Sequence, residues 1–134
     1  MPNLKTYDLF ISHAWKYNDE YYKLEEFLNG ASNFYYRNYS VPKHDPFDSD
    51  ENLKEALKRQ IRPVNCVLIL AGMYANHSKW IKFEIDYALQ IGKPIIVVKP
   101  WGQERVPVYL QENANEIVGW NTSTIVSAIR KHSL

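Results

Sequence analysis

The chain has 134 residues, of which 46% are hydrophobic and 23% are charged, as expected for one globular domain over residues 1–134. Sixteen basic and fifteen acidic residues give a net charge of +1, which argues against the broad positive surface that nucleic-acid binding requires. No window approaches about 20 apolar residues, and the N-terminus lacks the apolar region of a secretion signal. We therefore expect a cytoplasmic protein that binds neither nucleic acid nor a membrane.

The first third of the chain predicts a strand, a helix and a second strand. Residues 7–12 form a short, mostly apolar run that is typical of a strand covered on both faces. Asn18 or Asp19 then caps a helix that residues 29–30 end. Residues 33–41 contain enough aromatic and β-branched side chains for a second strand, and their polar members place it near a sheet edge.

The alternation of helices and strands continues to the end of the chain. The later elements that we expect are a helix over residues 52–61, a buried strand over 64–71, a helix over 78–92, a buried strand over 95–98, a short strand over 116–120 and a last helix capped by Thr122. About five alternations predict a flavodoxin-like α/β domain with three layers, in which a central parallel sheet of about five strands carries helices on both faces.

Ligands of such sheets bind outside the carboxyl ends of the strands, where the strand order reverses. The loops over residues 12–15, 42–50 and 72–77 should share that rim. We expect the first two loops to form the walls of a nucleotide site, in which Trp15 or Phe47 stacks on a base.

Several familiar sites are excluded by their motifs. The chain has no glycine-rich dinucleotide or P-loop motif, and residues 13–16 are a poor phosphate-binding loop. Lys99 and Pro100 resemble a response-regulator receiver, but residues 70–72 lack the aspartate that a receiver phosphorylates. The four histidines are scattered, so we expect no metal site. The single cysteine, Cys66, lies in an apolar run and should be a buried thiol.

A basic cluster precedes the third strand. Its members are Lys54, Lys58, Arg59 and Arg62. We interpret this cluster as the solvated face of a helix.

Glu84 is the most unusual residue in the pattern. In the helix over residues 78–92, Trp80, Glu84, Tyr87 and Ile91 share one line, which Ile81, Ile85, Ala88 and Leu89 widen into an apolar arc. A carboxylate inside an apolar arc is expensive to bury without a partner. Glu84 therefore reaches water at the edge of the arc, binds a loop backbone, or faces a cleft as a working group.

The sequence resembles TIR domains in two motifs. Residues 7–12, Y-D-L-F-I-S, resemble the first-strand signature of that superfamily, and residues 80–84, W-I-K-F-E, match its W-x-x-x-E helix motif. The loop over residues 42–50 stands where the family has its BB loop. The S-H-A-W sequence at residues 12–15 and the compact length are similar to the stand-alone bacterial family that includes the signalling subunit of Thoeris anti-phage systems.

The resemblance implies an enzyme that breaks the nicotinamide–ribose bond of NAD, with NAD as substrate and no separate cofactor. It gives the catalytic role to Glu84, and we assign substrate binding to Ser12, His13, Trp15, Phe47 and Trp80. The last of these also anchors the helix. If water is the nucleophile, the product is ADP-ribose. An attacking atom of the same molecule gives a cyclic isomer, and an attack by another small molecule gives a conjugate.

Two alternatives remain open at this stage. Many TIR domains only pair with other TIR domains, so the chain is alternatively a non-catalytic interaction module that self-associates. A nucleoside deoxyribosyltransferase-like enzyme would share the sheet and the glutamate, but not the strand motif. For the NAD enzyme, the resemblance and the small size imply a diffusible nucleotide that reaches a separate effector protein.

Overall fold

A computed structural model describes residues 6–12, 19–39, 50–71, 74–99 and 106–133. These residues form a five-stranded, fully parallel sheet in the order β2-β1-β3-β4-β5. The strands are β1 (Thr6–Ile11), β2 (Tyr35–Asn38), β3 (Cys66–Leu70), β4 (Ile95–Val98) and β5 (Glu116–Val118). The predicted flavodoxin-like α/β fold is confirmed, and β2 lies at a sheet edge as expected.

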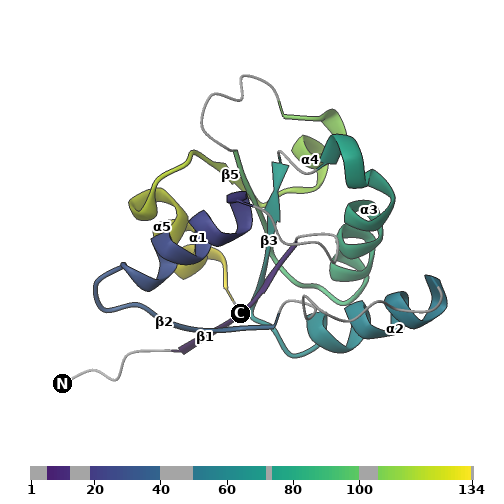
Figure 1. The fold of residues 1–134 in the computed structure, drawn as a ribbon, viewed down its shortest axis with the longest axis horizontal. Coiled ribbons are helices and arrows are strands. Elements are labelled where there is room, and N and C mark those ends of the chain that lie inside the picture. The colour runs from purple at the N-terminus through teal and green to yellow at the C-terminus, as the bar shows by residue number, and fades with distance from the viewer. Residues whose placement is uncertain (1–5, 13–18, 40–49, 72–73, 100–105, 134) are drawn as a thin grey trace.

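Helices cover both faces of this sheet. They are α1 (Asp19–Asn29), α2 (Asp50–Ile61), α3 (Tyr74–Gln90), α4 (Val108–Asn113) and α5 (Thr122–His132). Helices α1 and α5 lie together on one side, and α2, α3 and α4 lie on the other (Figure 1). No helix within the described ranges is long and apolar enough to cross a membrane.

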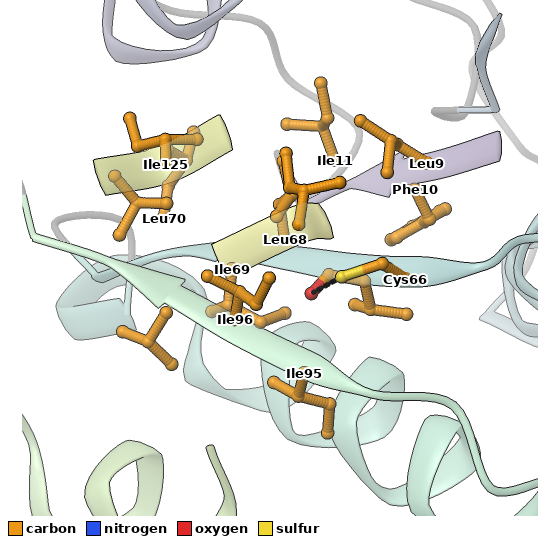
Figure 2. Packing of buried hydrophobic residues seen from close by; sticks show 14 of the residues in the cluster. Leu9, Phe10, Ile11, Cys66, Leu68, Ile69, Leu70, Ile95, Ile96 and Ile125 are labelled. Carbon is orange, nitrogen blue, oxygen red and sulfur yellow. Dashed lines mark hydrogen bonds between the residues drawn. The ribbon is translucent and has the colours of Figure 1, made fainter. Parts of the chain in front are cut away.

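The core forms where the apolar strands meet these two helical layers. Strands β3 and β4 are buried along their whole length, which explains why they appear in the sequence as continuous apolar runs. Figure 2 shows buried residues on both sides of the sheet, and on one of these sides strand residues lie together with a residue of α5. The strand residues near α5 include Leu9, Ile11, Leu68 and Leu70, and the residue of α5 is Ile125.

Cys66 is fully buried, as predicted. Burial raises the pKa of its thiol to about 12. The thiol is therefore protonated at neutral pH and packs as a small apolar group.

The last helix begins differently from the prediction. Asn121, not Thr122, is the N-cap, and its side-chain oxygen accepts a hydrogen bond of 2.9 Å from the backbone N–H of Thr124. Thr122 is the first residue of the helix. Both residue types can cap a helix, so the local sequence pattern did not discriminate between them.

The predicted solvated face of α2 is only partly solvated. Arg59 is exposed, but Lys54 and Lys58 lie about 6 Å from the ring centres of Phe83 and Tyr87 in α3. Arg62 donates a hydrogen bond of 2.9 Å to the Tyr87 hydroxyl. Basic side chains spaced by one helical turn thus hold α2 against the aromatic residues of α3.

Candidate active site

The strand order reverses between β1 and β3. The chain leaves β1 for β2 on one side of it and then returns to place β3 and β4 on the other side. In open parallel sheets, this reversal opens a crevice at the carboxyl ends of the strands. Ser12 is the residue that directly follows β1 at this point, and its backbone N–H donates a hydrogen bond of 2.8 Å to the Leu68 carbonyl of β3.

Glu84 of α3 meets Ser12 at the reversal. The Ser12 hydroxyl donates a hydrogen bond of 2.6 Å to Oε1 of Glu84. The exposed fraction is 0% for Ser12 and 1% for Glu84, so both polar side chains are removed from solvent. The other carboxyl oxygen, Oε2, is also buried and has no hydrogen-bond partner in the part of the chain that the structure describes.

The buried stripe of α3 is narrower than the predicted arc, and Glu84 belongs to this stripe. Ile81, Ile85 and Ala88 are completely buried, whereas Leu89, which we expected in the arc, is 46% exposed. The hypothesis that Glu84 reaches water at the edge of the arc is therefore wrong. Among the described residues, its partner is a side-chain hydroxyl and not the loop backbone that the second hypothesis named.

Burial dominates the ionisation of Glu84. Loss of water raises the pKa of this carboxyl from its ordinary value of 4.5 to about 8, although the Ser12 hydrogen bond acts in the opposite direction. The carboxyl group is thus mainly protonated at neutral pH when nothing else is bound. A positive charge placed beside it would restore the carboxylate.

Helix α3 begins earlier than the sequence pattern indicated. Its first residue is Tyr74, so Tyr74 to His77 belong to the helix and not to a loop. Glu84 therefore lies ten residues, or about 15 Å, into α3 and not in its first turns. Helix α3 thus completes more than two turns before it reaches the residue that meets Ser12.

Trp80 lies one turn before Glu84 and packs at the margin of the core. Its ring centre is 6.4 Å from that of Phe83, and the ammonium group of Lys79 lies 4.9 Å from the Trp80 ring centre. The ring is only partly buried, so it is a weaker anchor than we expected. Its predicted contact with substrate stays a prediction.

We expect Trp80→Ala to destabilise the fold less than Ile85→Ala. Ile85 is fully buried, and truncation of such a side chain lowers the free energy of unfolding by about 2–5 kcal/mol. A loss of about 1–3 kcal/mol follows for Trp80, because part of its ring already contacts water. Urea unfolding of both variants measures the difference. Equal losses in the free energy of unfolding would show that Trp80 anchors α3 as strongly as Ile85 does.

The other predicted binding residues lie outside the described residues. These are His13, Trp15 and Phe47, and most of the predicted wall over residues 42–50 lies outside with them. Of the predicted site, the structure brings together Ser12 and Glu84. Within the described ranges, no group of three or more histidine, cysteine, aspartate or glutamate side chains is arranged to hold a metal ion.

From the sequence we expected Ser12 in the rim wall and among the substrate-binding residues, and we missed its pairing with Glu84. Side chains alternate along a strand, so Ser12 shares a sheet face with Phe10, and Glu84 lies in the stripe that α3 turns toward that face. That alternation was a usable signal. The pairing itself spans 72 residues and depends on β1 and β3 being neighbours.

A parallel sheet in this order defines a flavodoxin-like α/β domain, and in this domain a buried glutamate lies at the strand-order reversal. The family model described as "Thoeris protein ThsB, TIR-like domain" matches residues 10–105. The chain belongs to this family.

Proteins similar to the chain include a bacterial relative and a solved structure. A relative from Cytobacillus dafuensis, named "Putative cyclic ADP-D-ribose synthase TIR2", is 26% identical over 135 residues. The match covers 93% of this chain but 34% of the relative, so the chain spans about a third of that protein. The solved structure of Clostridium botulinum CMP N-glycosidase BcmB is 15% identical to this chain and has a TM-score of 0.55. The match covers 92% of this chain and 98% of the BcmB chain, and it shows that the two proteins share a fold.

Proposed function

We propose that this protein is an NAD-processing enzyme that cleaves the nicotinamide–ribose bond and releases a cyclic nucleotide derived from ADP-ribose. The observation that carries the proposal is the Glu84 carboxyl group, which is buried at the strand-order reversal with Oε1 held by Ser12. Its Oε2 has no partner among the described residues. A buried oxygen of this kind requires an explanation, and a bound electron-poor ribose carbon supplies one.

The chemistry needs only one carboxylate. When the bond between ribose C1′ and the pyridinium nitrogen breaks, its electron pair stays on the nitrogen, and nicotinamide leaves as a neutral molecule. No general acid is required, in contrast to ordinary glycosides, whose hydrolysis uses two carboxyl groups. The ribose becomes positively charged in the transition state, and an anion in a water-poor site stabilises that state more than the ground state.

The raised pKa of Glu84 also fits a cationic substrate. The carboxyl group is mainly protonated in the empty protein at neutral pH, because its pKa is about 8. The positive charge of the bound pyridinium ring favours the carboxylate, so NAD itself promotes the catalytic form. An uncharged N-glycoside brings no such charge, and this difference favours NAD as the substrate class.

The choice of product follows from the nucleophile that attacks C1′. A ring nitrogen or a ribose hydroxyl of the same molecule gives a cyclic isomer, and the name of the Cytobacillus dafuensis relative supports this outcome. Membership in the Thoeris family supports a role in anti-phage defence, in which the nucleotide diffuses to a separate effector protein. Self-association through the TIR-like domain belongs to the same proposal. NAD is the substrate in this scheme, with no further cofactor.

The test is incubation of the purified protein with NAD, NADH or CMP, followed by mass spectrometry of the products. We expect nicotinamide and a cyclic ADP-ribose isomer from NAD. NADH should stay intact, because dihydronicotinamide is uncharged before the bond breaks and is a poor leaving group. Protein from phage-challenged and unchallenged cells is assayed in parallel, so that an activating signal is included.

The outcomes separate the competing functions. Cleavage of CMP in place of NAD would identify a nucleotide N-glycosidase. Protein from challenged cells that leaves every substrate intact would identify a non-catalytic interaction module. If NAD is cleaved but a filtrate from challenged cells fails to activate the cognate effector, the signalling part of the proposal is wrong.

A further inference from the structure

The hydroxyl of Ser12 is held in place by the sheet itself. Its backbone N–H continues the pairing of β1 with β3 by one residue, through the bond of 2.8 Å to the Leu68 carbonyl. The residue is 0% exposed, so the hydroxyl cannot turn toward bulk water. Its hydrogen bond to Oε1 of Glu84 therefore connects a long side chain to a rigid strand end.

We propose that Ser12 is a positioning residue that holds Oε1 of Glu84 and thereby presents Oε2 to the ribose of the substrate. The proposal rests on the proposed function and deepens it, because it assigns different tasks to the two oxygens of one carboxyl group. Oε1 accepts the Ser12 hydrogen bond, and Oε2 is the oxygen without a partner in the described ranges. Oε2 is also the oxygen that carries the proton of the neutral acid, because Oε1 is already engaged.

Positioning matters at this site because the glutamate side chain has three rotatable bonds. An anion stabilises a developing charge only when it is held at the correct distance before the reaction begins. Ile81 and Ile85, which are buried on the same stripe of α3, have no polar group that could select the orientation of the carboxyl plane. A single directional hydrogen bond from Ser12 does select it.

The charged and titratable groups on the neighbouring elements are engaged elsewhere or are neutral. On β1, Asp8 pairs with Arg37 of β2 at 2.6 Å, and on β3 the Cys66 thiol is protonated because its pKa is about 12. Strand β4 carries only isoleucine and valine. Lys58 of α2 and Arg62, which directly follows α2, are directed at Tyr87. Within the described residues, the Ser12 hydroxyl is thus the polar group that lowers the pKa of Glu84 against the effect of burial.

The proposal is tested with Ser12→Ala, the conservative Ser12→Thr, and Ser127→Ala as a matched control on the exposed side of α5. The first readout is the pKa of the Glu84 carboxyl, measured by carbon NMR of glutamate-labelled protein, with Glu84→Gln identifying the signal. Loss of the hydrogen bond to the charged form should raise this pKa by about one to two units. The hydroxyl that Ser12→Thr retains should restore most of the wild-type value, and Ser127→Ala should not change it.

The second readout is steady-state NAD cleavage as a function of pH. In Ser12→Ala, the rise of kcat/KM with pH should move upward with the Glu84 pKa, and kcat on the plateau should fall about tenfold to a hundredfold while KM changes little. Threonine should rescue both quantities. A variant that merely loosened the fold would lower activity without moving the pH profile.

The two readouts keep this proposal separate from the proposed function. An unchanged Glu84 pKa in Ser12→Ala would overturn the positioning role, as would a loss of rate with an unshifted pH profile. If the wild-type protein fails to cleave NAD but the Glu84 pKa still rises in Ser12→Ala, the NAD assignment is wrong. In that case Ser12 remains the group that holds Glu84.

Discussion

Replacement of Glu84 by glutamine is expected to lower NAD turnover a few hundredfold and to leave the fold intact. Glutamine keeps the size of the side chain and an oxygen that can accept the Ser12 hydrogen bond, but it cannot become an anion. Removal of one preorganised electrostatic group raises the activation barrier by about 3–4 kcal/mol, which corresponds to the expected loss in rate. The loss should appear in kcat, because the interaction forms fully only in the transition state.

The measurement compares NAD turnover with thermal melting under conditions in which the wild-type protein is active. Glu112→Gln is the matched control, because Glu112 is an exposed glutamate of α4. This control should retain wild-type turnover and wild-type melting. A Glu84→Gln protein that melts at or above the wild-type temperature and cleaves NAD at the wild-type rate would contradict the catalytic assignment.

The second large effect that we expect is a loss of stability as the pH rises from about 4.5 to about 8. Across this interval the unfolded chain has released the Glu84 proton, whereas the folded protein still holds it, because burial raises the folded-state pKa to about 8. Folding therefore takes up a proton, and each increase in pH disfavours it. The stabilisation is complete below pH 4.5 and is lost as the pH passes through 8. Its full size is about 4–5 kcal/mol.

Urea unfolding of wild-type and Glu84→Gln proteins between pH 4 and pH 9 measures this contribution. The two proteins should have similar stability below about pH 4.5, where Glu84 is protonated in both the folded and the unfolded wild-type chain. The variant should become progressively more stable than the wild type as the pH rises to about 8, because it has no proton to lose, and the difference should stay constant above that pH. Parallel stability curves for the two proteins over this range would contradict the buried, neutral state of Glu84.

Much of the fold could be predicted because its signals are local. The continuous apolar runs that became β3 and β4 indicate strands buried on both faces, and they need no information from distant residues. The order of elements then requires a parallel sheet with helices on both sides, as observed. The polar residues of β2 indicated an edge strand, because a strand at a sheet edge is less buried and tolerates polar side chains.

The boundaries of the elements were less well determined. Residues 74–77 contain no strong apolar period and follow a glycine, so the pattern indicated a loop where α3 in fact begins. Asn121 and Thr122 are both good caps, and only the backbone geometry shows that Asn121 accepts the capping hydrogen bond. Leu89 was expected in the buried arc, but it is exposed. The stripe of α3 that neighbouring elements cover is narrower than the arc formed by its apolar residues.

The sequence alone was enough to single out Glu84, because a carboxylate within a helical apolar stripe is an energetic anomaly that periodicity reveals. It left open whether that carboxylate reaches water, binds the backbone or faces a cleft. The tertiary structure decided this by placing Ser12 opposite Glu84 across 72 residues and by burying both. Strand order sets that contact, and strand order depends on how crossovers pack on the whole sheet. The ionisation of Glu84 is likewise a property of the assembled fold, because only the packed layers around the carboxyl group remove its water.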